Sequence, residues 1–286
     1  MQPLYSDIIN VINAQMPNFQ PKIGIILGSG LGEIAESLDD AISISYKNIP
    51  HFFQSTVKGH QGKMVLGWMS GVPVVCMQGR IHVYEGAEPD SLKIFIRTMK
   101  LLGCEALIIT NAAGSFREEV GPGSLCLVTD HINMQHRNPL IGPNDEEFGS
   151  RFFAMDNAYD SELRKLCLQT ANNLNITLHE GVFLGVTGPC FETPAEIRAF
   201  KLLGADVTAM SMVPEVIIAR HCSLKVVGIS VVTNLAAGMG QTSITHEETL
   251  RYGKMGAANL SRLIQGFVKA IGNNYAILSS HTNAST

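Results

Sequence analysis

Charged side chains are scarce in this sequence of 286 residues: Asp, Glu, Lys and Arg make up 16% of it, and the net charge is −4. No run of Lys and Arg supplies a basic patch, so the charge pattern gives no reason to expect a nucleic acid partner. No apolar run approaches the roughly 18 residues of a membrane span. Residues 1–20 lack the basic start and long apolar stretch of a signal peptide. We therefore expect neither nucleic acid nor membrane as a partner.

Closely spaced cysteines are also missing. The six cysteines are scattered along the chain, and none of them forms a C-x-x-C pair. Most of them stand in apolar segments, as the reduced, buried thiols of cytoplasmic proteins do. The sequence therefore predicts a cytoplasmic protein.

Several common catalytic motifs do not occur. The sequence has no H-E-x-x-H zinc motif, no G-x-S-x-G nucleophile turn and no D-x-D cluster of acids. The segment His246-Glu247-Glu248 lacks a second histidine four residues later, which argues against a zinc site. No evident pair of carboxylates suits an ordinary glycosidase. The commoner hydrolase chemistries are thus not favoured.

A glycine-rich turn, Gly28-Ser29-Gly30-Leu31-Gly32, follows the apolar segment 22–27 and precedes a segment that looks helical, 33–38. Glycines let the backbone approach a ligand, and the free N–H groups at such a turn bind anions. The spacing does not fit the G-x-G-x-x-G dinucleotide fingerprint, and no Gly-Lys-Ser/Thr of a phosphate-binding P-loop follows. The turn is either an anion site, with the Ser29 hydroxyl among its amides, or a tight turn without a ligand.

Alternating apolar strands and amphipathic helices predict a single α/β domain over residues 1–286. Its sheet is expected to be mixed, largely parallel and twisted, with helices on its flanks. The sequence predicts an N-terminal helix within residues 1–20 and a disordered tail over residues 279–286. The clearest strands are predicted over residues 22–27, 63–69, 72–78, 106–110, 124–129, 180–187 and 226–232. Helices are predicted over residues 89–102, 159–173, 193–203, 213–221 and 247–271.

Small or polar residues follow several of these strands. The segments are GSGLG (28–32), GRIHVY (79–84), TNAAG (110–114), GPCFET (188–193), MSMVPE (210–215) and VVTN (231–234). Open α/β sheets bind ligands at the edge where parallel strands end. Together these segments offer backbone amides, an arginine, histidines, hydroxyls, a carboxylate and a carboxamide. This inventory favours a small oxyanion bound beside a sugar and a polar heterocycle.

Two of these assignments have simpler alternatives. Arg80, His82 and Tyr84 alternate in what reads as extended chain, so they would share one face, but such a row is also found on an exposed strand edge. Glu192 either binds a ligand or only complements the start of the helix that Thr193 caps.

In their order along the chain, these segments resemble those of the trimeric, low-molecular-mass purine nucleoside phosphorylases, over about residues 20–270. The matching segments are GSGLG (28–32), GRIHVYEG (79–86), TNAAG (110–114), NPLIGPND (138–145), GPCFET (188–193), GADVTAMSMVPEVIIARH (204–221) and VVTNLAAGM (231–239). The resemblance implies the nucleoside phosphorylase fold and a pentosyltransferase of purine salvage. Such an enzyme uses phosphate to cleave the N-glycosidic bond reversibly, giving free base and (deoxy)ribose 1-phosphate.

The resemblance also assigns roles to residues. Phosphate would be bound by Ser29, His60, Arg80, His82, Ala112 through its backbone N–H, and Ser211. Ribose would contact Tyr84, Met210, His246 and, from a neighbouring subunit of a homotrimer, Phe152. The base would lie among Phe191, Glu192, Thr208, Thr233 and Asn234. Asn234, His82 and Glu192 would be catalytic. No metal or organic cofactor is implied, because inorganic phosphate is the co-substrate.

The substrate expected from this resemblance is a 6-oxopurine nucleoside, inosine or guanosine. The Asn234 carboxamide can accept from N7–H and donate to O6, whereas family members that select 6-amino purines look to carry aspartate there. The Glu192 carboxylate can accept from N1–H, which adenine lacks. The alternatives are a xanthosine or methylthioadenosine phosphorylase, or a catalytically silent purine-binding protein. Xanthosine phosphorylases look to have a tyrosine near the position of Val186, and this chain does not.

Overall fold

Nine strands share one sheet in the part of the chain that this computed structural model describes, residues 2–57, 60–240 and 246–279. The strands are β1 (Ile23–Leu27), β2 (Asp39–Ser45), β3 (Lys63–Met69), β4 (Val72–Gln78), β5 (Ala106–Ser115), β6 (Leu125–Met134), β7 (Leu178–Val186), β8 (Val207–Ala209) and β9 (Lys225–Leu235). Hydrogen-bonded neighbours follow the order β2-β3-β4-β1-β5-β8-β7-β6-β9. As the sequence predicts, the sheet is mixed, and parallel pairs are a slight majority.

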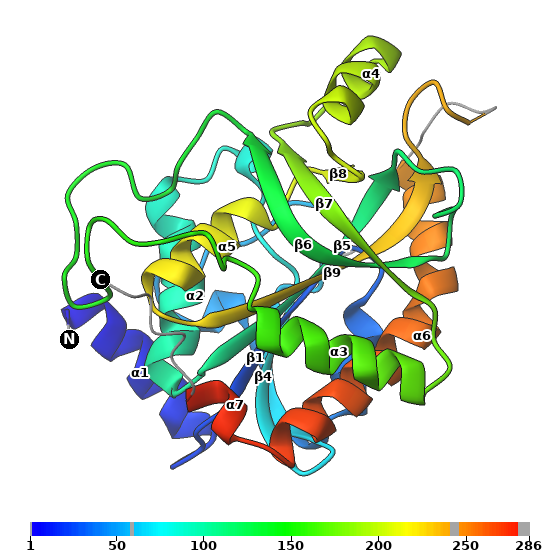
Figure 1. Cartoon of the computed structure of the whole chain (residues 1–286). Helices are drawn as coiled ribbons and strands as arrows, with labels where there is room; N and C mark the ends of the chain where they lie inside the picture. The colour runs from blue at the N-terminus through cyan, green and yellow to red at the C-terminus, as the bar shows by residue number, and fades with distance from the viewer. Residues whose placement is uncertain (1, 58–59, 241–245, 280–286) are drawn as a thin grey trace.

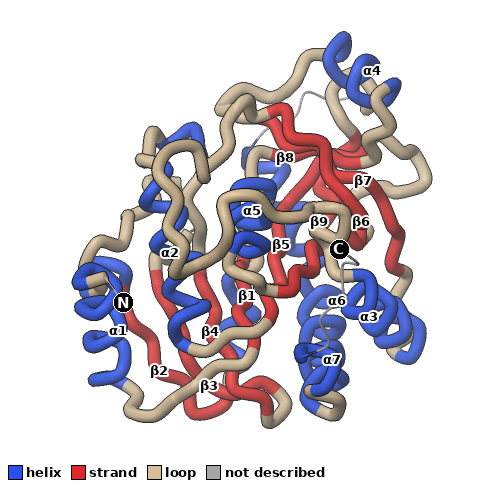
Figure 2. The backbone as a smooth tube through the Cα atoms, turned by 60° about the vertical axis from the view of Figure 1, so that its left-hand side comes forward, coloured by secondary structure: helices blue, strands red, loops and turns tan. Residues whose placement is uncertain are grey.

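The sheet closes on itself at one end. Strand β9 pairs not only with β6 but also with β5, so β5, β8, β7, β6 and β9 form a ring. Strands β1 to β4 extend from this ring as an open sheet. Figure 2 separates the two parts, with β1 to β4 on the left and the ring toward the upper right. Strand β5 is the junction, because it belongs to both.

Helices cover the two faces of this sheet (Figure 1). They are α1 (Pro3–Gln15), α2 (Pro89–Leu102), α3 (Ser161–Asn173), α4 (Pro194–Leu202), α5 (Val213–His221), α6 (His246–Gly272) and α7 (Ala276–Ser279). Helices α1, α2 and α5 pack into one hydrophobic core, whereas α3, α6 and α7 pack into the other. Alternate strand residues serve the two cores, since Ile26 of β1 faces the first, and Ile25 and Leu27 face the second. Helix α4 projects from the body, and Ile197 is its buried residue.

Several predicted elements are confirmed. Strands β3 and β4 form the antiparallel hairpin, and Gly103 ends α2 in the left-handed conformation at φ 115°. At α4, the Thr193 hydroxyl accepts from the Glu196 N–H at 3.3 Å, and the Glu196 carboxylate accepts from the Thr193 N–H at 2.7 Å. This reciprocal pair is a capping box, which fixes where α4 begins. No helix in the described ranges is both long and apolar enough to cross a membrane.

Other predictions were wrong. Strands β5 and β9 run on to Ser115 and Leu235, five and three residues past their predicted ends, because the two strands keep pairing to their ends. Residues 83–85 form a 3₁₀ turn where extended chain was predicted. The helical segment predicted after the glycine-rich turn is present, as a 3₁₀ helix over residues 32–37. Strand β2 was not predicted, because as an edge strand it is mostly exposed. The tail does not begin at Ser279, which ends α7, and residues 280–286 lie outside the described part.

The packing of α6 into a hydrophobic core predicts how a substitution in this helix changes the free energy of unfolding. Leu263 of α6 is fully buried, whereas Leu202 at the end of α4 is 89% exposed. Leu263→Ala should therefore lower the free energy of unfolding by about 2–5 kcal/mol, and the matched control Leu202→Ala should change it by less than about 0.5 kcal/mol. Urea denaturation of both variants measures the difference. Equal losses for the two would contradict this packing of α6.

Candidate active site

A cavity of about 380 Å³ opens along one edge of β5. Strand β1 pairs with β5 only as far as Ile109, and β8 joins the same sheet at Gly114, so residues 110–113 have neither as a neighbour. Three of the four residues in this gap, Asn111, Ala112 and Ala113, line the cavity. Its wall consists of Gly28, Ser29, Val57, Arg80, His82, Tyr84, Asn111, Ala112, Ala113, Gly114, Pro189, Phe191, Glu192, Thr208, Ala209, Met210, Ser211, Thr233, Asn234 and Ala236.

A register shift in β9 supplies two of these side chains. Ala113 of β5 pairs with Val232, but the next residue, Gly114, pairs with Asn234. Thr233 is thus the extra residue of a bulge. Successive strand residues normally point to opposite faces, and a bulge relaxes this alternation. Thr233 and Asn234 consequently both line the cavity.

The glycine-rich turn lies directly against β5. A Cβ atom on Gly28 would come within 2.7 Å of the Asn111 Cα, so the position tolerates only glycine without a backbone shift. The Gly28 N–H donates to the Thr110 hydroxyl at 3.2 Å, and that hydroxyl donates to the Ile26 carbonyl at 3.0 Å. This chain of hydrogen bonds holds Ser29 at the cavity wall.

His60 connects Ser29 to the backbone of Arg80. Its Nε2 lies 3.0 Å from the Ser29 Oγ, and its Nδ1 lies 2.9 Å from the Arg80 N and 3.0 Å from the Arg80 O. Burial, together with the positive charge of Arg80 and the nearby His82, lowers the pKa of His60 to about 4, so the ring is neutral near pH 7. A buried N–H without an acceptor costs more than a carbonyl without a second donor. We therefore assign Nδ1 as the acceptor for the Arg80 N–H, which leaves the ring proton on Nε2.

The guanidinium of Arg80 is 3% exposed and lies between the cavity and the protein interior. Its Nη2 donates to the Thr110 carbonyl, and its Nε lies 3.6 Å from the Glu215 carboxylate. Burial lowers the pKa of Arg80, but Glu215 opposes that shift and helps to keep the side chain charged. Nε and Nη1 have no hydrogen-bond partner among the described residues. Because Nε faces Glu215, Nη1 is the donor that remains for an anion.

His82 and Tyr84 are stacked, with ring centroids 4.8 Å apart and planes 15° from parallel. The Glu85 carboxylate anchors them, accepting from the His82 N–H at 2.8 Å and lying 3.3 Å from the His82 Nδ1. Burial alone would raise the pKa of Glu85, but hydrogen bonds from His82, Thr56 and Ser55 outweigh it and lower the pKa to about 2. The charged carboxylate thus holds His82 in place.

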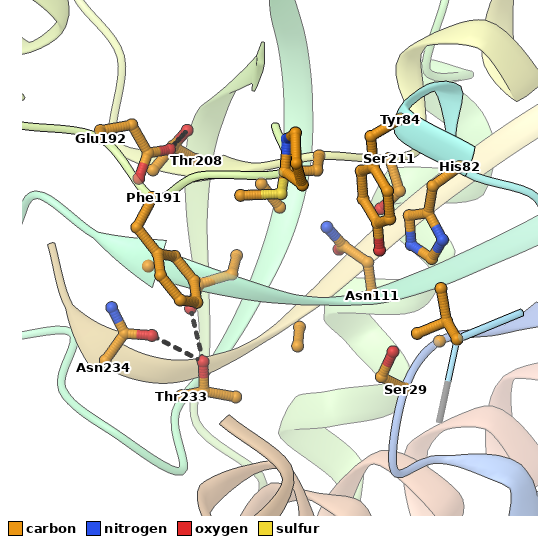
Figure 3. A pocket seen from close by; sticks show the side chains of 18 of the residues that line it. Ser29, His82, Tyr84, Asn111, Phe191, Glu192, Thr208, Ser211, Thr233 and Asn234 are labelled. Atoms are coloured by element: carbon orange, nitrogen blue, oxygen red, sulfur yellow. Dashed lines mark hydrogen bonds between the residues drawn. The ribbon is translucent and has the colours of Figure 1, made fainter. Parts of the chain in front are cut away.

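The opposite end of the cavity has a different chemistry (Figure 3). The Glu192 carboxylate accepts from the Thr208 hydroxyl at 2.8 Å, beside the ring of Phe191. Across the cavity, the Asn234 Oδ1 accepts from the Thr233 hydroxyl at 2.8 Å, and its Nδ2 donates to the Leu235 carbonyl at 3.0 Å. One lone pair of the Asn234 oxygen and one hydrogen of its nitrogen remain unused.

The structure brings together most of the predicted residues. Two polar groupings lie at opposite ends of the cavity: Ser29, His82, Tyr84 and Ser211 at one, and Glu192 and Asn234 at the other. His60 lies behind Ser29 and does not line the cavity. Phe152 is 88% exposed and also takes no part in the wall formed by this chain. His246 begins α6, but its side chain lies outside the described part of the structure.

Three polar residues were not singled out from the sequence. Asn111 is 2% exposed, accepts from the Ser230 hydroxyl at 2.7 Å and has an unpartnered Nδ2 within the described structure. Glu85 and Glu215 are the acids that partner His82 and Arg80. Of these three residues, only Glu85 could have been found from the sequence, because its three-residue spacing from His82 is that of a capping box. Asn111 lay inside a quoted motif that was read as a loop.

Comparisons with known proteins agree with this geometry. A sequence model of the phosphorylase superfamily matches residues 22–269. Purine nucleoside phosphorylase 1 of Bacillus subtilis is 46% identical over 248 residues, which cover 87% of this chain and 92% of that protein. The purine nucleoside phosphorylase of Mus musculus is 42% identical over 265 residues, covering 90% and 91%.

Solved structures of similar proteins share the fold of this chain. The crystal structure of Schistosoma mansoni purine nucleoside phosphorylase in complex with adenosine is 40% identical, with a TM-score of 0.88, over 93% of this chain and 96% of that one. The complex of the same enzyme with inosine also has a TM-score of 0.88, at 39% identity over 93% and 95%. This chain therefore belongs to the purine nucleoside phosphorylase family.

Proposed function

We propose that this protein catalyses the reversible phosphorolysis of 6-oxopurine ribonucleosides and deoxyribonucleosides, inosine and guanosine, to free base and (deoxy)ribose 1-phosphate. One observation carries the proposal: a single cavity has oxyanion donors at one end and a carboxylate and a carboxamide at the other. A nucleoside with its sugar in the middle would reach both ends. Phosphate would then face the anomeric carbon from the side opposite the base.

At the phosphate end, the proposed ligands are Ser29, Arg80, His82, the Ala112 N–H and Ser211, with His60 acting through Ser29. In the tautomer assigned above, the His60 Nε2–H donates to the Ser29 Oγ, so the hydroxyl hydrogen of Ser29 is free for the anion. The Nη1 donor of Arg80, which has no partner among the described residues, would supply a charge-assisted hydrogen bond. Asn111, with its unused Nδ2 at the same wall, adds a further donor.

At the base end, Phe191 would pack against the purine, with Thr208 and Thr233 orienting their neighbours. The unused lone pair of Asn234 can accept from N7–H, and its unused hydrogen can be donated to O6. Glu192 is positioned by Thr208 and can accept from N1–H of hypoxanthine or guanine. An adenine N1 would face this carboxylate with a lone pair, which is repulsive.

The proposed chemistry needs no covalent enzyme intermediate. As the glycosidic bond lengthens, electrons flow into the purine, which takes up a proton at N7, and Asn234 accepts the resulting N7–H hydrogen bond. Monohydrogen phosphate loses one proton when it bonds to the ribosyl carbon, so the protons balance. The ribosyl group becomes cationic, and phosphate on its other face stabilises it and then bonds to it with inversion. Catalysis comes from positioning and preorganised hydrogen bonds. We propose that no metal or organic cofactor takes part.

Further parts of the proposal concern the sugar and the assembly. Tyr84, which lies beside His82, and Met210 both line the cavity and would contact the ribose, and His246 would lie near its 5′-hydroxyl. Phe152, exposed on the long connection between β6 and α3, would complete the site of a neighbouring subunit in a homotrimer. We also propose a cytoplasmic location, supported by six free cysteines, and a role in purine salvage.

A substrate panel tests the proposed specificity. Base release from inosine, guanosine, xanthosine, adenosine and methylthioadenosine should be compared at saturating phosphate. Inosine and guanosine should have the highest kcat/KM. Adenosine belongs in the panel because a relative of known structure contains it. Preference for adenosine or methylthioadenosine would contradict the roles of Asn234 and Glu192, and binding without turnover of any nucleoside would contradict catalysis.

Asn234 provides a sharper prediction. Asn234→Ala should lower kcat for inosine by about 10²–10³-fold and leave phosphate affinity nearly unchanged, because the hydrogen bond at N7 strengthens in the transition state. Steady-state kinetics and phosphate titration separate the two effects. Asn172→Ala, on the exposed face of α3, is the matched control and should behave as wild type. A variant that loses only inosine affinity would contradict the role.

His60 predicts how stability depends on pH. Its pKa is about 4 in the folded protein, whereas an unperturbed histidine has a value of about 6.5. Between these values the unfolded chain binds a proton that the folded chain does not, so the free energy of unfolding falls as pH drops. Wild type should lose about 1–2 kcal/mol more than His60→Asn between pH 8 and pH 5. Urea denaturation across this range measures the loss. Parallel pH profiles for both proteins would show that His60 is not buried neutral.

A further inference from the structure

A buried carboxylate stands behind the arginine of the cavity. Glu215, near the start of α5, is 3% exposed, and its Oε1 lies 3.6 Å from the Arg80 Nε. Glu215 does not line the substrate cavity. It faces a small void on the inner side of Arg80, among apolar side chains that include Met77 and Met99. Arg80 thus has substrate on one side and Glu215 on the other.

The opposite charges of Arg80 and Glu215 offset each other, although neither side chain makes all the hydrogen bonds that it could. The Glu215 Oε1, like the Arg80 Nε and Nη1, has no hydrogen-bond partner among the described residues. A separation of 3.6 Å neutralises charge but is too long for a good hydrogen bond. The guanidinium therefore keeps its Nη1 donor for an anion, while its positive charge is already offset by Glu215.

This offset matters because the cavity has little other positive charge. Arg80 is the one Arg or Lys among the described residues that line it. His60 is neutral near pH 7, and His82 is paired with the charged Glu85. An incoming phosphate dianion would thus meet donors but almost no net positive charge. Hydrogen bonds can select the anion, whereas uncompensated positive charge would hold phosphate and sugar phosphate tightly.

From this arrangement we propose that Glu215 is a built-in counter-charge that weakens phosphate binding at Arg80 and so allows the phosphorylated product to leave. The inference rests on the proposed function, because it assumes that phosphate binds at Arg80. Glu215 acts through Arg80 and does not touch the substrate. It is therefore a positioning and tuning residue, not a catalytic one.

The sign of its effect distinguishes this role from a structural one. A neutral Glu215→Gln side chain has nearly the same shape but no longer opposes the anion. Arg80 stays at the cavity wall, because its Nη2 remains bonded to the Thr110 carbonyl. A structural carboxylate, once removed, would weaken phosphate binding. A counter-charge, once removed, should strengthen it, by about tenfold or more on the scale of like-charge effects at buried sites.

The test is phosphate binding measured by calorimetry on the full chain, with inorganic phosphate as the probe, together with the KM for phosphate and kcat for inosine. Glu215→Gln should lower the Kd and the KM for phosphate about tenfold and lower kcat, as release becomes slower. Glu215→Asp keeps the charge but withdraws it by one methylene group. Its Kd for phosphate should therefore lie between those of wild type and Glu215→Gln. If Glu215→Gln folds poorly, the Kd of Glu215→Asp for phosphate still shows whether weakening the counter-charge strengthens binding.

A matched control is available in the same chain. Asp160 is a buried carboxylate whose Oδ2 lies 3.4 Å from the Lys225 Nζ, and it does not line the cavity. Asp160→Asn keeps the cap of α3 and should leave the Kd for phosphate unchanged, even if stability falls. An unchanged or raised Kd in Glu215→Gln, with wild type binding phosphate, would overturn the inference alone. Absence of phosphate binding by wild type would instead overturn the proposed function, and the inference with it.

Discussion

The hydrogen bonding of β5 is the constraint on which the rest of the structure depends. This strand bonds to β1, β8 and β9, and it is the only described strand shared by the open sheet and the closed ring. The gap between the end of β1 and the start of β8 makes the cavity, and the bulge opposite Gly114 turns Thr233 and Asn234 into it. Both ends of the proposed substrate site are thus set by one strand, so base and phosphate are held at a fixed separation.

Electrostatics add a second constraint. The cavity lies in a protein with large apolar cores on both faces of its sheet, where an unpaired charge is costly. Three side chains at the proposed phosphate end are therefore backed by a partner: Arg80 by Glu215, His82 by Glu85, and Ser29 by a neutral His60. A site built in this way binds an anion through directed donors. Such a site suits an enzyme that has to release a phosphorylated product on every turnover.

Most residues that line the cavity could be identified from the sequence, but few of the residues that hold them in place could be. Ser29, Arg80, Glu192 and Asn234 stand in short motifs next to predicted strands, so their placement followed from strand order. Periodicity could not show that β5 and β9 continue through residues 111–115 and 233–235, because most residues there are small or polar and are held in the sheet by pairing. Glu215 and Ser230 act from behind the wall, and no local pattern marks a residue that touches another residue across the fold.

The central claim is that phosphate at the Arg80 end of the cavity, and not water, attacks the sugar. The most direct test is to identify the sugar released from inosine in the presence and absence of phosphate, for example by ³¹P and ¹³C NMR. We predict α-ribose 1-phosphate in amounts equal to the hypoxanthine formed, at a rate that saturates with phosphate, and almost no reaction without it. Release of free ribose at a rate independent of phosphate would contradict the account.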